Sequence, residues 1–162
     1  MKVEAIKLNM DSRFDPPDPE TGQYTKRQLE EIKLGIIGEL VELLDLTGKV
    51  SNTSKLKHDL TNREKKASTA IGQHIAIPHV RTMQAKQFVM AIGRNSDGYE
   101  FEAPDHLPVK MFFCMAAPPY DDALYLKVFK TLASRFQMPG FIDNLLTEED
   151  PNMIIRLFKE LE

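Results

Sequence analysis

Residues 72–81 read GQHIAIPHVR, and this stretch indicates the fold most directly. Ile75 and Ile77 alternate with other residues, which is the period-two pattern of a β-strand. Pro78 is expected to end that strand, because proline has no N–H to donate to a neighbouring strand. His79 follows at once, so we expect its side chain at a strand terminus that faces a loop. Ligand-binding and catalytic groups of open α/β sheets gather at such strand ends.

Further strands are predicted on both sides of this stretch. Residues 88–92 and 109–115 are short, nearly continuous apolar runs, which suit strands buried on both faces of a sheet. Between them, Asn95–Gly98 reads as a turn, with Tyr99–Phe101 as the second strand of a short hairpin. Residues 3–8 alternate apolar and charged side chains and predict a half-buried strand near the N-terminus.

A long amphipathic helix is predicted to begin at Thr25. Gln28 lies three residues later, as a capping box requires, and apolar residues recur at helical spacing as far as Leu44. Gly35 weakens the helix intrinsically, so we expect it to permit close packing there. Gly48 is expected to end the helix.

Three more helices complete the predicted elements. A shorter helix starts within residues 51–54 and runs to about Glu64. A later helix is capped by Asp121 or Asp122, and a final one begins at Asp150–Pro151, with aspartate as the cap and proline at the first helical position. Helices on either side of a set of strands predict an α/β sandwich, whose strand order the residues leave open.

The composition is that of an ordinary globular protein. The chain has 162 residues, and we expect residues 1–162 to form one domain with a proline-rich surface loop at about 15–22. The 24 acidic and 21 basic residues give a net charge of −3, which argues against a general nucleic-acid binder. The single Cys114 and the lack of a signal peptide or an apolar span indicate a cytoplasmic protein with no direct membrane insertion.

The residues alone leave the chemistry open. His79 is placed to act as a nucleophile or an acid/base, although spacing by itself favours a partly buried structural histidine. His74 and His79 are five apart and would lie on opposite faces of a strand, so no metal pair is predicted. Arg63 either ends a solvated basic stretch, the reading that its position alone favours, or holds a phosphate with its guanidinium.

A family resemblance supplies the missing context. Arg63-Glu64 followed by residues 68–81, STAIGQHIAIPHVR, resembles the signature of the fructose/mannitol-type enzyme IIA domain. That domain belongs to the phosphoenolpyruvate-dependent sugar phosphotransferase system, and the resemblance extends from roughly Thr25 to the C-terminus. It implies a mixed, mostly parallel central sheet flanked by helices on both faces, an α/β/α sandwich. The absence of attached domains makes the chain more similar to the nitrogen-regulatory branch than to a sugar-transport subunit.

The resemblance also implies a function. His79 corresponds to the phospho-acceptor of the family, and Arg63 to the arginine that flanks the phosphohistidine. The upstream partner would be a histidine phosphocarrier protein. The downstream partner would be an enzyme IIB or a regulated target protein that responds to the phosphorylation state. Phosphoryl transfer of this kind needs positioning and charge compensation and no cofactor or metal.

Three further residues concern the site. We expect Thr69 to offer a hydroxyl near the phosphoryl group. Tyr125 stands where fructose and mannitol members carry a second histidine, and a phenol donates a hydrogen bond without adding charge. His74 replaces a usual glycine and would either enter the site or crowd a partner. These departures leave a second hypothesis open, a non-catalytic binding module with weak or lost phosphotransfer.

Overall fold

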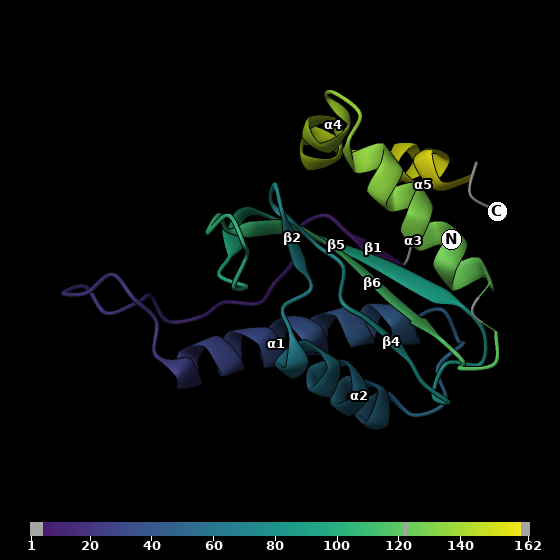
Figure 1. The fold of residues 1–162 in the computed structure, drawn as a ribbon, viewed down its shortest axis with the longest axis horizontal. Helices are drawn as coiled ribbons and strands as arrows, with labels where there is room; N and C mark the ends of the chain where they lie inside the picture. Colours follow the sequence, from purple (N-terminus) through teal and green to yellow (C-terminus); the bar gives the residue numbers. More distant parts are fainter. Residues whose placement is uncertain (1–4, 122, 160–162) are drawn as a thin grey trace.

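The computed structural model describes residues 5–121 and 123–159 and shows a six-stranded sheet between two layers of helices (Figure 1). The helices are α1 (Lys26–Asp45), α2 (Thr53–Lys66), α3 (Ala123–Phe136), α4 (Phe141–Thr147) and α5 (Pro151–Lys159). The strands are β1 (Ile6–Lys7), β2 (Ala70–Gly72), β3 (Ile75–Ala76), β4 (His79–Arg81), β5 (Val89–Tyr99) and β6 (Val109–Ala117). Within these described ranges, no helix combines the length and the apolar character that crossing a bilayer requires.

The sheet is mixed, as the resemblance implies. Its strand order is β1-β5-β6-β3-β2, and β4 pairs with β6 beside β3. The pairings β1·β5, β3·β6 and β4·β6 are parallel, whereas β5·β6 and β2·β3 are antiparallel. Helices α1 and α2 cover one face of the sheet, and α3, α4 and α5 cover the other (Figure 1). The predicted α/β/α sandwich is therefore confirmed.

Strand β6 separates two hydrophobic cores. Phe112 and Cys114 point to the core beneath α1 and α2, whereas Phe113 and Met115 point to the core beneath α3, α4 and α5. All four side chains are fully buried. Burial on both faces explains why residues 109–115 form a continuous apolar run rather than an alternating one.

The start of α1 follows the prediction closely. Thr25 accepts a hydrogen bond from the backbone N–H of Gln28, and the Gln28 side chain accepts one from the Thr25 N–H, which completes the capping box. A Cβ atom at Gly35 would lie 2.7 Å from the Phe14 ring, so the glycine is what lets that ring approach the helix. The helix itself ends at Asp45, and Gly48 follows in a left-handed conformation at φ +73°.

Four predictions about the elements need correction. The hairpin at Asn95–Gly98 is wrong: β5 continues through these residues, because the Asn95 side chain accepts hydrogen bonds from the Asp97 and Gly98 N–H groups and forms a bulge within the strand. Tyr99 then pairs with Val109 on β6. Pro78 interrupts the strand rather than ending it, and His79 opens β4. Helix α2 extends to Lys66, and α4 was not predicted.

Several expectations concern the ends of elements. Ile6–Lys7 forms the described part of the N-terminal strand, and residues 3 and 4 lie outside the described residues, as does Asp122. Asp150 caps α5 through its carboxylate, which accepts a hydrogen bond from the Asn152 N–H at 2.9 Å. Residues 15–22 are mostly exposed, contain no helix or strand, and project beyond the start of α1 (Figure 1).

Candidate functional site

His79 lies at the first position of β4, opposite Met115 on β6, and faces the helix layer that contains α3. Its Nδ1 atom is 2.6 Å from the Ile77 carbonyl oxygen. A carbonyl oxygen only accepts, so Nδ1 carries the hydrogen and donates it. This bond selects one tautomer and leaves a lone pair on Nε2. The Ile77 carbonyl therefore fixes both the orientation and the tautomer of the ring.

Burial lowers the pKa of His79 below its ordinary value of 6.5, and the positive charge of Arg63 lowers it further, against the opposing effect of the Ile77 bond. The Phe129 ring packs on the imidazole with its edge, at a centroid distance of 4.9 Å. A desolvated ring beside a cation is neutral at pH 7. A neutral imidazole is the form that can attack phosphorus.

This shift gives a pH prediction. In the window between the lowered folded pKa and 6.5, the unfolded chain binds more protons than the folded one, so the contribution of His79 to the free energy of unfolding rises with pH. An NMR titration of the His79 ring is expected to show a midpoint below 6.5, with Phe129→Ala moving it upward by admitting water. A midpoint above 6.5 would contradict the burial argument.

Arg63 lies in the last turn of α2, and its Nη1 atom donates to the Ala67 carbonyl at 3.1 Å. Its charge lowers the pKa of both His79 and Tyr125, although burial is the larger influence on each. The structure therefore brings Arg63, His79 and Tyr125 together from three separate elements.

The hydroxyl of Thr69 has a partner that the sequence did not suggest. Its hydroxyl donates to the Glu64 carboxylate at 2.6 Å, and its backbone N–H donates to the same carboxylate at 2.8 Å. Glu64 is buried, and Lys33 lies 3.7 Å from it. The Thr69 hydroxyl hydrogen is directed to Glu64, so this residue supports the Ala67–Thr69 turn, whose first carbonyl binds Arg63. Its expected direct hydrogen bond to the phosphoryl group is not what the geometry provides.

Tyr125 lies in the first turn of α3, buried, with its ring 6.0 Å from the His79 ring. Burial raises the pKa of its phenol, and the charges of Arg81 and Arg63 act in the opposite direction. The Arg81 guanidinium carbon lies 5.4 Å from the centre of the Tyr125 ring. Arg81 was given no role from the sequence. Arg81 lies two residues after His79, and such residues lie on the same face of a strand. This spacing could have identified Arg81 as a neighbour of His79.

His74 does not join this site. It lies in the tight turn between β2 and β3 at φ +69°, and its Nδ1 atom is 2.8 Å from the Pro108 carbonyl oxygen. Ile75 pairs with Met111 and His79 with Met115. Four residues of β6 separate the two positions, or about 13 Å along the strand. The predicted entry of His74 into the site is therefore wrong, because the strand register places it towards the other end of β6.

The arrangement suits transfer of an anionic group to nitrogen. It combines a neutral imidazole with a free Nε2, two guanidinium groups near Tyr125, and a phenol that can donate one hydrogen bond. Within residues 5–121 and 123–159, no three His, Cys, Asp or Glu side chains are grouped so as to hold a metal ion.

Comparison with known proteins assigns the family. Residues 26–161 match the family model described as "Phosphoenolpyruvate-dependent sugar phosphotransferase system, EIIA 2". The chain is 31% identical over 128 residues to the fructose-specific EIIABC component of Bacillus subtilis, an alignment that covers 79% of this chain and only 20% of that longer protein.

Two solved structures extend the comparison. The nitrogen regulatory protein IIA-Ntr from Neisseria meningitidis superimposes with a TM-score of 0.78 at 25% identity, over 96% of this chain and 94% of that one. The Escherichia coli mannitol enzyme IIA, solved in complex with phosphorylated enzyme IIB, shares the fold at a TM-score of 0.72 and 17% identity, over 99% and 97% of the two chains. With the family model matched from α1 almost to the end of the chain, the protein belongs to the EIIA type 2 family of the phosphoenolpyruvate-dependent sugar phosphotransferase system.

Proposed function

We propose that this protein is a phosphohistidine phosphocarrier or regulatory protein whose acceptor is Nε2 of His79. The upstream donor is a histidine phosphocarrier protein. The observation that carries the proposal is the bond from Nδ1 to the Ile77 carbonyl, at 2.6 Å, because it leaves Nε2 as the free nucleophilic nitrogen of a neutral ring. Family membership supports the same role.

The transfer step exchanges one nitrogen–phosphorus bond for another. The Nε2 lone pair of His79 attacks phosphorus, and the bond between phosphorus and the donor histidine breaks with its electron pair returning to the donor ring. The Nδ1 hydrogen stays on its nitrogen and continues to bind the Ile77 carbonyl. Positioning and charge stabilisation supply most of the catalysis in such a step. Arg63 provides a positive charge that acts on the ring.

Two downstream roles fit this chemistry. In one, the phosphoryl group passes to an enzyme IIB, as the complex of the related mannitol protein with phosphorylated IIB suggests. In the other, the phosphorylation state itself controls a target protein, as the name of the Neisseria relative suggests. The second candidate function is a binding module with weak transfer. The phenol of Tyr125 favours it, because a phenol cannot supply the charge of an imidazolium.

The direct test is phosphorylation in a defined mixture. The protein is incubated with phosphoenolpyruvate, enzyme I and a histidine phosphocarrier protein, and its intact mass is followed with time. We expect the mass to rise by one phosphoryl group, with an acid-labile modification as for a nitrogen-bound phosphate. A mixture without the phosphocarrier protein is the control. No mass change in the complete mixture would favour the binding module.

Arg63 is expected to support the phosphohistidine rather than the fold. It is half-exposed and donates a hydrogen bond to a backbone carbonyl, so Arg63→Ala should change the free energy of unfolding by no more than about 1 kcal/mol. The same change should slow phosphorylation and shorten the lifetime of the phosphoprotein. Lys65→Ala, in the same helix turn, is the matched control. A large fall in melting temperature with unchanged transfer would make Arg63 structural.

Tyr125 offers a graded series at one position. Tyr125→Phe should lower the rate of phosphorylation modestly, because one neutral hydrogen bond contributes roughly 0.5–1.5 kcal/mol. Tyr125→His should raise the rate or extent, since a charge-assisted bond is about twice as strong as a neutral one. Arg81 and Arg63 disfavour the imidazolium in the free protein, but an incoming phosphoryl group reverses that balance. Equal rates in all three proteins would show that position 125 does not contact the phosphoryl group.

A further inference from the structure

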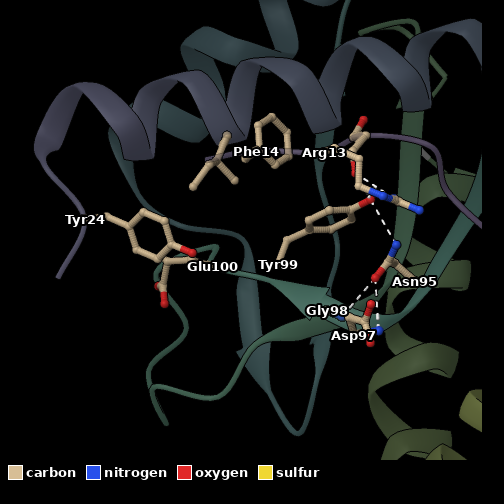
Figure 2. Close-up of a pocket in the computed structure, with 10 residues that line it drawn as sticks. Arg13, Phe14, Tyr24, Asn95, Asp97, Gly98, Tyr99 and Glu100 are labelled. Carbon is tan, nitrogen blue, oxygen red and sulfur yellow. Dashed lines mark hydrogen bonds between the residues drawn. The ribbon is translucent and has the colours of Figure 1, made fainter. Parts of the chain in front are cut away.

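A cavity of about 170 Å³ lies on the opposite face of the sheet from His79, between α1, the segment that precedes it and the end of β5 (Figure 2). Three aromatic side chains, Phe14, Tyr24 and Tyr99, line it together with the charged side chains of Arg13, Asp97 and Glu100. Its volume is below the range of about 300–1,000 Å³ that is usual for drug-sized ligands. A ligand for this cavity would be small.

Two of its aromatic walls are held in place. The Tyr99 hydroxyl donates to the Ser12 carbonyl at 2.8 Å and accepts from the Asn95 side-chain amide at 3.2 Å. Phe14 meets the Tyr99 ring edge to face at a centroid distance of 5.7 Å, and it occupies the space that the missing side chain of Gly35 leaves. Binding here would therefore order few side chains that are not already ordered.

The third aromatic wall and a carboxylate complete the cavity. Tyr24 lies across from Tyr99, and Glu100 lies beside Tyr24 (Figure 2). Tyr24 is half-buried, so part of its ring remains open to a ligand. One oxygen of Glu100 accepts from the Glu102 N–H at 3.0 Å, which fixes the carboxylate and leaves its second oxygen for another partner.

The charge around the cavity favours a cation. The two carboxylates of Asp97 and Glu100 exceed the single positive charge of Arg13. Arg13 also donates hydrogen bonds from Nη1 to the Met10 and Ser12 carbonyls. An adjoining hollow shares Arg13 and Phe14 and adds the carboxylates of Asp15 and Glu31, of which Glu31 already pairs with Arg27 at 3.2 Å. Aromatic faces attract cations, whereas they offer no ligand to a hard metal ion.

We propose that this cavity binds a small organic cation, an alkyl-substituted ammonium group, against the rings of Phe14, Tyr24 and Tyr99 with Glu100 as its counter-ion. An ammonium that carries alkyl groups loses less hydration than a bare one when it enters an aromatic cavity, and it matches both the apolar walls and the acidic rim. The site is separate from the phosphoryl chemistry proposed for His79 and does not depend on it.

The test compares two probes of the same shape. Choline and its neutral isostere 3,3-dimethylbutan-1-ol are titrated into the full chain, with the amide signals of Tyr99 and Glu100 followed by NMR. We expect saturable shifts with choline and at least about tenfold weaker binding of the alcohol, since the charge supplies the main attraction. Glu100→Gln keeps the acceptor for the Glu102 N–H and should weaken choline binding about tenfold. Glu30→Gln, on the exposed side of α1, is the matched control.

The remaining outcomes also decide the proposal. Tyr24→Leu keeps an apolar side chain and should weaken choline binding, whereas His79→Ala should leave it unchanged. Equal binding of choline and the alcohol would overturn the proposal in favour of a purely apolar cavity. An absence of saturable shifts up to about 10 mM choline would overturn it altogether.

Discussion

Replacing His79 with alanine is expected to abolish phosphorylation by the phosphocarrier mixture while leaving the fold intact. The change removes Nε2, the only ring nitrogen that the Ile77 bond leaves free. It also removes one hydrogen bond to a backbone carbonyl and the edge contact with Phe129. These losses should lower the free energy of unfolding by only about 1–2 kcal/mol, because the site is half-exposed and two intact cores remain.

The measurement is intact mass together with thermal unfolding. The wild-type protein should gain one phosphoryl group, and His79→Ala should gain none at any time point. His74→Ala is the matched control, because His74 lies towards the opposite end of β6 from His79. This substitution should leave labelling unchanged. Labelling of His79→Ala at the wild-type level would reject the assignment. Labelling lost in both variants would point to a requirement outside the acceptor ring.

The fold was predictable where its signals are local or periodic. The capping box at Thr25 needs only two side chains three residues apart, and the structure shows it as expected. The two-sided burial of β6 follows from a run of apolar residues that no surface strand would carry. The predicted hairpin failed for the opposite reason. Asn95–Gly98 has the composition of a turn, but pairing with β6 resumes at Tyr99, so long-range strand pairing overrides the local preference.

Helix α4 escaped prediction because it carries little sequence signal. It has seven residues and begins after Gly140 in a left-handed conformation, without a side-chain cap. Its stability comes from tertiary contacts: Ile142 and Leu145 are buried in the core beneath α3. A guanidinium from β5 also reaches its C-terminal end, where Arg94 donates to the Leu145 carbonyl at 2.9 Å. Neither contact is visible in a window of local sequence.

In the candidate site, too, local sequence signals were predictable and tertiary contacts were not. The residues around His79 single it out at a strand end, and the family signature adds Arg63, whereas Arg81, two residues after His79 on β4, was not predicted. What spacing cannot supply is the direction of a side chain across the fold. The hydroxyl of Thr69 turns to Glu64, and the ring of His74 turns to the Pro108 carbonyl. Both orientations depend on partners that the fold brings close, so spacing along the sequence could not predict them.

Glu64 is the residue whose loss should damage the protein most. Its carboxylate is buried, with a side chain 2% exposed, and it accepts two hydrogen bonds from Thr69 while lying 3.7 Å from the Lys33 ammonium. Glu64→Ala would leave a buried N–H, a buried hydroxyl and a nearly buried cation without this partner. Breaking a buried ion pair by removing one member costs about 3–5 kcal/mol, so we expect a loss of that size in the free energy of unfolding.

The control for this prediction uses the same lysine. Glu102 lies 3.6 Å from Lys33 on the other side, but its side chain is 51% exposed. Glu102→Gln should therefore change the free energy of unfolding by no more than about 0.5 kcal/mol, since solvent screens an exposed pair. Chemical denaturation of the two variants beside the wild type measures both values. Equal, small losses would show that the buried position of Glu64 carries no special stability.

Glu64→Ala is also expected to affect the phosphoryl site proposed at His79, through the backbone. Glu64 holds Thr69, the Ala67–Thr69 turn leads from α2 into β2, and the carbonyl at the start of that turn binds Arg63. Under conditions where Glu64→Ala remains folded, its phosphorylation should therefore slow in the manner of Arg63→Ala, although the contacts of Glu64 are with Thr69 and Lys33. Glu64→Gln separates the two effects, because an amide oxygen can still accept from the Thr69 N–H and keep the turn in place. We expect Glu64→Gln to lose stability because Lys33 keeps only the exposed Glu102 as an ionic partner, yet to retain most of the phosphorylation rate. A wild-type rate in folded Glu64→Ala would show that Arg63 is positioned without this turn.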